Sequence, residues 1–256
     1  AYDYQQVRQI YLPPAQRWAV WRDKPLEVAQ RSWFFETAAL FAELTTTRVT
    51  PDNARWVLEA DIKGCFDHIN HDWLLRNVPM DTAVLRKWLK AGVIYKGMLQ
   101  ASEAGTPQGG IISPTLANMA LNGLESGLVA HLGAKLGRTK AKNLKINVVR
   151  YADDFVITGI SQELLENEVK PWVVGFLQQR GLQLAPEKTR IVTIDDGFDF
   201  LGWNFRKYSG TLLIKPSKKN AEAFYRKVKE AISSHKTVRQ ETLIRLLNPL
   251  LRGWAN

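Results

Sequence analysis

The sequence predicts an α+β protein, with a mixed body over residues 55–214 and a basic helical segment over residues 215–256. Two observations predict this division. Short β-branched runs alternate with helical patterns through the body, whereas only helical spacing follows Pro216. Apolar residues make up 45% and charged residues 23% of the 256 residues, which are ordinary globular values and exclude disordered and collagen-like chains.

The first half of the body is expected to contain one strand followed by helices. Residues 55–62 (RWVLEADI) alternate and carry β-branched side chains, which predicts a strand that ends on a carboxylate. Asn70 and Asp81 each precede apolar residues at helical spacing, so we expect a helix to begin at each. Residues 105–110 (GTPQGG) predict a loop, and residues 115–132 predict one long amphipathic helix.

The second half of the body is expected to contain two hairpins. In residues 146–160 (INVVRYADDFVITGI), two apolar runs flank a pair of acids, which is typical of a β-hairpin with carboxylates at its tip. A helix over residues 162–180 and a strand over residues 189–193 follow. Residues 198–207 and 211–214 are then expected to pair as the second hairpin.

Charge is concentrated at the C-terminal end of the chain. There are 35 Lys and Arg against 25 Asp and Glu, a formal charge of +10. Residues 215–256 contain ten basic and three acidic residues, so seven of the ten excess positive charges lie there. This asymmetry favours a polyanionic partner such as nucleic acid, with solvated helix faces as the alternative.

Cysteine and hydropathy patterns bear on compartment. The single Cys65 excludes a disulfide within the chain and predicts neither a disulfide-linked partner nor an oxidising compartment. The sequence contains neither a signal-peptide pattern nor an apolar run of about 18 residues, so we expect no membrane partner and a cytoplasmic location.

Three aspartates interrupt the apolar strands. Asp61 ends the first strand, and Asp153 and Asp154 form the tip of the first hairpin. Carboxylates beside buried strands are costly unless a cation lies near them. Divalent metal ions that activate a hydroxyl nucleophile would satisfy that requirement. The alternative is that these aspartates only cap turns and helices.

The order of motifs resembles the palm of reverse transcriptases. The motifs are residues 61–67 (DIKGCFD), 105–114 (GTPQGGIISP) and 151–154 (YADD). The amino-acid sequences of these motifs are similar to those of the bacterial group II intron-encoded reverse transcriptase/maturase family. Residues 200–203 (FLGW) are similar to its primer-grip hairpin, and residues 252–256 (RGWAN) to the start of its maturase region.

This resemblance implies a right-hand polymerase: an antiparallel palm sheet packed on helices, with partial fingers and a helical, basic thumb. Residues 55–214 would be the palm and residues 215–256 the thumb and the start of the maturase region. Residues 1–54 would be partial or divergent fingers, since the basic triphosphate-gripping loop of the family is not recognised there. One Cys and four His are too few for a zinc-bound endonuclease.

The resemblance also implies site residues. Two Mg²⁺ ions, with Mn²⁺ as the alternative metal, would be held by the side chains of Asp61, Asp153 and Asp154 and by the Ile62 carbonyl. Phe66 would exclude a nucleotide 2′-hydroxyl, unless it is only a core residue. Gln108 and Gly109 would contact the incoming nucleotide, unless they only form a turn. Lys188 would protonate pyrophosphate, unless it is an ordinary surface lysine.

The implied function is that of an RNA-directed DNA polymerase that extends a DNA primer on an RNA template with deoxynucleoside triphosphates. The alternatives are a maturase-like RNA-binding protein without polymerisation, and a reverse transcriptase of a CRISPR-associated or defence locus. Structured intron RNA is a further expected partner, within a bacterial ribonucleoprotein particle. The residues expected to contact nucleic acid are Gly202, Trp203, Lys215, Lys218, Lys219, Arg226, Lys227 and Lys229.

Overall fold

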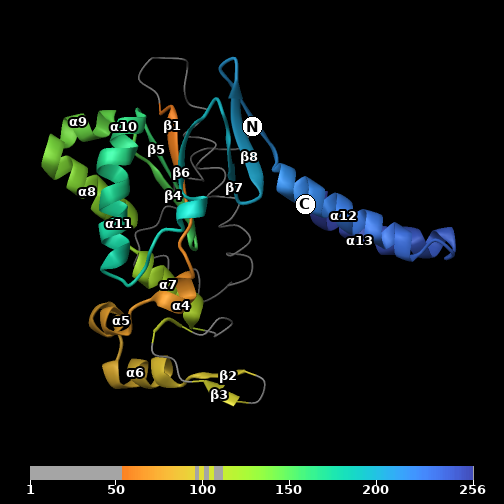
Figure 1. The fold of residues 1–256 in the computed structure, drawn as a ribbon, viewed down its shortest axis with the longest axis horizontal. Helices are drawn as coiled ribbons and strands as arrows, with labels where there is room; N and C mark the ends of the chain where they lie inside the picture. Colours follow the sequence, from red (N-terminus) through yellow and green to blue (C-terminus); the bar gives the residue numbers. More distant parts are fainter. Residues whose placement is uncertain (1–53, 96–97, 101–103, 107–111, 256) are drawn as a thin grey trace, which may run out of the picture.

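A four-stranded antiparallel sheet forms the centre of the computed structural model, which describes residues 54–95, 98–100, 104–106 and 112–255 (Figure 1). Its strands lie in the order β4 (Val148–Tyr151), β5 (Asp154–Gly159), β1 (Trp56–Ala60) and β6 (Arg190–Thr193). Strand β1 pairs with both β5 and β6, so the two sequence-predicted strands and the first hairpin are confirmed.

Helices cover one face of this sheet (Figure 1). Residues 115–132 are not one helix, so that prediction was wrong: Gly123 has φ 90°, a left-handed conformation that ends one helix and starts the next. The helical segments on this side are α7 (Ser113–Leu121), α8 (Leu124–Leu136), α9 (Arg138–Asn143), α10 (Gln162–Leu164), a π-helical turn (Leu165–Val169) and α11 (Lys170–Gln178).

A second, three-stranded sheet covers the other face of the central sheet. It consists of β7 (Phe198–Phe200), β8 (Trp203–Tyr208) and β9 (Thr211–Pro216). The prediction of one strand over 198–207 was wrong, because Leu201 at φ 50° and Gly202 at φ 82° reverse the chain there. The stacked rings of Phe198 and Phe205, 5.3 Å apart, fill the space between the two sheets.

Alternation along β1 assigns its side chains to these two faces. Leu58 and Ala60 belong to the helix-side core, whereas Val57 belongs to the apolar cluster under the three-stranded sheet. Glu59 and Asp61 share the parity of Val57 and therefore lie on the side of the three-stranded sheet. The first hairpin is fixed at its tip, where the Arg150 guanidinium donates to the Ala152 carbonyl at 2.7 Å.

The segment after β1 forms short helices that begin where the sequence predicts. Asn70 caps α5 (His71–Asn77) through the Trp73 N–H at 2.8 Å, and Asp81 caps α6 (Thr82–Lys90) through the Val84 N–H at 2.9 Å. The remaining elements here are α4 (Cys65–His68), β2 (Val93–Tyr95) and β3 (Met98–Gln100). A 3₁₀ turn, η2 (Pro186–Lys188), lies between α11 and β6.

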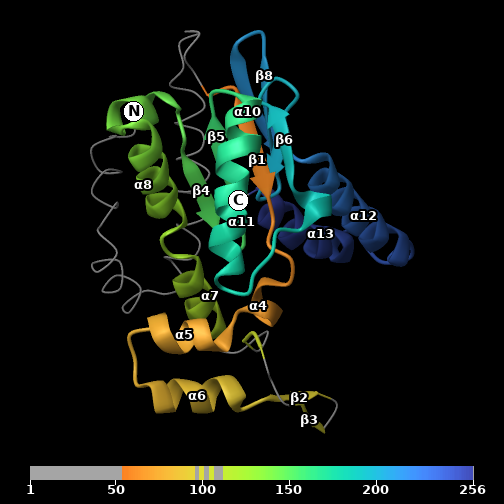
Figure 2. The ribbon, with the colours of Figure 1, turned by 60° about the vertical axis from the view of Figure 1, so that its left-hand side comes forward.

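Two helices form an arm that extends away from the body (Figures 1 and 2). They are α12 (Lys218–Ser234), capped by Ser217, and α13 (Gln240–Ala255). The two helices run side by side, and the rings of Phe224 and Trp254 stack 4.4 Å apart between them. None of the helices in the described residues is long and apolar enough to cross a membrane. The expected fingers, residues 1–54, lie almost wholly outside the described part of the chain.

Candidate active site

The three sequence-predicted aspartates converge at one end of the central sheet. Ala60 pairs with Phe155 across β1 and β5, which brings Asp61, the residue that follows β1, beside Asp154. The two side chains are close enough for Asp61 to raise the pKa of Asp154. Asp153 lies at the hairpin turn and lines a hollow of about 260 Å³ together with Asp61 and Phe66.

Mutual repulsion makes this cluster a site for positive charge. The pKa of Asp154 is raised to about 6, first by partial burial and then by the neighbouring carboxylates of Asp153 and Asp61, while Lys188 opposes the rise. A carboxylate whose pKa is raised in this way is stabilised as the anion by any added cation. The donors are hard oxygen atoms, the ligand type that Mg²⁺ and Mn²⁺ prefer.

Lys188 already supplies one positive charge to this cluster. Its Nζ lies 2.5 Å from Asp61 Oδ2, and this contact raises the pKa of Lys188. The backbone fixes the pairing, because the Ala185 N–H donates to the Asp61 carbonyl and the Lys63 N–H to the Gln183 carbonyl, both at 2.9 Å. The side chain of Lys188 is 63% exposed, so it can leave Asp61 without unfolding the turn.

Among the described residues, the β-bridge of Ile62 leaves the carbonyl of this residue unused. Ile62 forms an isolated antiparallel bridge with Leu184, and both flanking hydrogen bonds are made by Asp61 and Lys63. In such a pair the central carbonyl points away from the partner, here toward the β5 side. Within the described residues, no group of three or more His, Cys, Asp or Glu side chains is placed to hold a metal ion by itself. An open oxygen set suits Mg²⁺, which combines one or two carboxylates with substrate phosphates.

The remaining predicted substrate residues fall into two groups. Phe66 is half-buried on α4, where it contacts the helix-side core and also lines the hollow beside Asp61 and Asp153. Gln108 and Gly109 lie outside the described residues.

Cys65 is buried and free, and burial together with Asp153 raises the pKa of its thiol to about 12, which excludes it as a nucleophile at neutral pH.

The β7–β8 turn forms the opposite wall of the site. A cleft of about 280 Å³, hereafter the Asp61 cleft, separates this turn from the end of β1, and its lining includes Glu59, Asp61, Asp154, Lys188, Arg190 and Leu201. The Gly202 carbonyl accepts hydrogen bonds from the Ser217 N–H at 2.9 Å and the Asn220 amide at 3.3 Å. Trp203 is half-buried against the apolar cluster beneath the turn.

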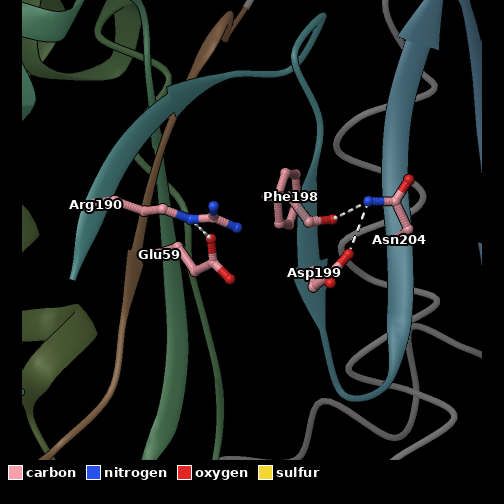
Figure 3. A network of polar contacts seen from close by, with 5 residues as sticks. All are labelled: Glu59, Arg190, Phe198, Asp199 and Asn204. Atoms are coloured by element: carbon pink, nitrogen blue, oxygen red, sulfur yellow. Dashed lines mark hydrogen bonds and ion pairs between the residues drawn. The ribbon is translucent and has the colours of Figure 1, made fainter. Parts of the chain in front are cut away.

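The sequence-predicted basic residues are all exposed and lie on the arm or at its base. Lys215 is on β9, which corrects its expected place in the helical segment: its strand continues to Pro216. The others are on α12: Lys218, Lys219, Arg226, Lys227 and Lys229. Sequence reasoning missed Glu59 and Arg190, whose ion pair lines the Asp61 cleft (Figure 3).

An antiparallel sheet that bears three converging aspartates, with a hairpin wall and a helical arm beside it, defines a polymerase palm. The telomerase from Candida tropicalis in complex with a TWJ fragment of telomeric RNA has a similar fold, with a TM-score of 0.51. It is 15% identical in sequence, and the match covers 98% of this chain and 45% of the telomerase. The chain belongs to the reverse transcriptase (RNA-dependent DNA polymerase) family, whose model matches residues 26–205.

The C-terminal part matches a second family model. Residues 221–256 match the maturase-specific domain of group II introns. Protein YkfC from Escherichia coli is 33% identical, with 62% of this chain and 49% of YkfC covered. The group II intron-encoded protein LtrA from Lactococcus lactis is 29% identical, with 62% of this chain and 36% of LtrA covered. The chain therefore spans half or less of the length of these relatives.

Proposed function

We propose that the protein extends a DNA primer on an RNA template by nucleotidyl transfer at the Asp61 cleft. The observation that carries this proposal is the convergence of Asp61, Asp153 and Asp154 at one end of the sheet in a reverse transcriptase family chain. Two Mg²⁺ ions, or Mn²⁺, held there with the Ile62 carbonyl would activate the primer hydroxyl and neutralise the phosphates. We infer a cytoplasmic, bacterial ribonucleoprotein particle as the setting.

The chain's own residues are assigned complementary roles. Asp61, Asp153 and Asp154 hold the reacting groups in position, and Lys188 donates a proton to the departing pyrophosphate. Phe66 lines the hollow beside two of these carboxylates, where it excludes a 2′-hydroxyl and so selects deoxynucleotides. The residues proposed to follow the nucleic-acid backbone are Gly202, Trp203, Lys215, Lys218, Lys219, Arg226, Lys227 and Lys229.

The test is primer extension on an RNA template by Asp61→Asn and Asp153→Asn variants in Mg²⁺. We expect both substitutions to abolish extension while RNA affinity stays within a few fold, because the binding charge lies on the arm. Asp72→Asn is the matched control, since Asp72 is an exposed carboxylate on α5 outside the cleft. Normal extension by either cleft variant would refute the metal assignment.

A maturase role is the second candidate. It is supported by the match of residues 221–256 to the group II intron maturase-specific domain and by the exposed lysines of α12. A structured intron RNA should then bind the Asp61→Asn variant as tightly as the wild type. If the variant loses primer extension but keeps intron RNA binding, the two activities are separate. If the wild type extends a primer but does not bind intron RNA, only the polymerase function is supported.

A further inference from the structure

The Asp61 cleft is acidic, although nucleic acid must enter it if the proposed function is right. Five carboxylates and two bases line it among the described residues: Glu59, Asp61, Asp154, Glu187 and Asp199 against Lys188 and Arg190. Lys188 is already paired with Asp61. Arg190 is the other described base in the cleft lining, and its guanidinium carries more donors than its ion pair with Glu59 uses.

Arg190 is held in one orientation by Glu59. The two residues are cross-strand neighbours on β6 and β1, and the Arg190 Nε–H donates to Glu59 Oε2 at 2.6 Å (Figure 3). Within the described residues, the two terminal nitrogens of Arg190 have no hydrogen-bond partner. The Arg190 side chain is 57% exposed and the Glu59 side chain 19%, so the arginine fork is accessible while its anchor is covered.

Asp199 does not occupy the free end of Arg190. The carboxylate of Asp199 accepts a hydrogen bond from the Asn204 amide at 2.7 Å, which directs it toward β8 (Figure 3). Burial raises the pKa of Glu59, and the ion pair with Arg190 and the backbone N–H of Asp199 oppose that rise. The ion pair with Arg190 thus anchors the Glu59 carboxylate, and it fixes one N–H of the guanidinium.

The position of the Glu59–Arg190 ion pair fits a nucleic-acid strand whose end lies at Asp61. Glu59 lies two residues before Asp61 on the same face of the sheet, a separation of about 6.6 Å at the strand rise of about 3.3 Å per residue. Neighbouring phosphates of one nucleic-acid strand are separated by a similar step. A guanidinium with two free N–H groups in a fixed plane is suited to bind a phosphate with two hydrogen bonds.

We propose that Arg190, oriented by Glu59, binds a backbone phosphate of the nucleic-acid strand whose end reaches Asp61. This inference rests on the proposed function, because it assumes that a primer strand enters the Asp61 cleft. Arg190 contacts the phosphate directly, and Glu59 is a positioning residue that fixes the plane of the guanidinium. The ligand class is a phosphodiester, whatever the base sequence.

The test is equilibrium binding of a DNA primer annealed to an RNA template, measured with Arg190→Ala and with primers that carry one neutral methylphosphonate linkage. The neutral linkage is placed in turn at each of the last three positions before the 3′ end. We expect Arg190→Ala to weaken binding of the unmodified primer about tenfold. At one position, the neutral linkage should weaken wild-type binding similarly, and Arg190→Ala should then cause less than a twofold further loss.

Three further variants separate orientation from charge. Glu59→Gln keeps the shape but removes the charged anchor, so it should weaken binding a few fold and lose sensitivity to the same linkage. Arg190→Lys keeps the charge without the fork and should restore binding only in part. Arg206→Ala is the charge-matched control, because Arg206 donates to the Asp195 carbonyl, lies over the Tyr208 ring and is not part of the cleft lining.

Two results would overturn the inference. One is an Arg190→Ala effect that is equal for all three neutral linkages and the unmodified primer. The other is an Arg206→Ala effect as large as that of Arg190→Ala, which would reduce the role of Arg190 to net charge. Both measure binding without turnover, so they stand apart from the proposed function, which fails if the wild type does not extend the unmodified primer. Thermal unfolding of each variant verifies that it is folded.

Discussion

Replacing Asp154 by asparagine should stabilise the metal-free protein above neutral pH. The pKa of Asp154 is raised from 3.8 to about 6 in the folded state, so between these values the folded protein binds more protons than the unfolded chain. Stability therefore falls as pH rises through this window, and the loss is complete above about pH 7. A shift of about two units corresponds to at most about 3 kcal/mol, and solvent screening of this exposed group reduces that to about 1 kcal/mol.

The assay is thermal or urea unfolding of wild type and Asp154→Asn at pH 5 and pH 7.5 in a chelator. At pH 7.5 the variant should unfold about 2–4 °C higher than the wild type, and at pH 5 the gap should shrink. The difference in stability between the wild type and the variant cancels the contribution of groups that titrate in both proteins. Added Mg²⁺ should stabilise the wild type more than the variant. Identical pH dependence in the two proteins would refute the electrostatic reasoning.

Three other substitutions test separate parts of the fold. Phe66→Val should raise ribonucleotide incorporation relative to deoxynucleotide incorporation, and unchanged discrimination would make Phe66 a core residue only. Gly105→Ala should destabilise the protein by about 2–4 kcal/mol in urea unfolding, since φ is +75° and the added Cβ would meet the Phe66 carbonyl oxygen; a loss below about 1 kcal/mol would contradict this. The double change Lys218→Ala, Lys219→Ala should make the negative slope of log affinity against log salt shallower by about two units. An unchanged slope would exclude both lysines as phosphate contacts.

The sequence alone was sufficient to predict the end of the sheet where the three aspartates lie. Alternation predicted β1 and the first hairpin, and the acids that interrupt them are the three carboxylates that converge. The helix starts at Asn70 and Asp81 followed from capping chemistry, which depends only on neighbouring residues. These features are local, so a linear pattern could predict them. The roles of the site residues came from the resemblance and stay predictions.

The errors and omissions depend on contacts between distant residues or on backbone conformation. A glycine within an amphipathic pattern gives no warning that it will adopt φ 90°, so the break at Gly123 was missed. The turn at Leu201 was missed because a non-glycine residue rarely adopts φ 50°. Predicting the pairing of Glu59 with Arg190 requires knowledge of the register between β1 and β6. The two residues are 131 positions apart in the sequence. Alternation did imply that Glu59 shares the face of Asp61.

One carbonyl joins the arm to the wall of the cleft. Because the Gly202 oxygen accepts from both Ser217 and Asn220, the first turn of α12 is tied to the tip that carries Leu201. A rotation of the two-helix arm must either break these bonds or pull on that tip. The arm and the Asp61 cleft are thus mechanically linked through this peptide group as well as through β9, so a duplex that displaces the arm would also widen or narrow the gap facing Asp61.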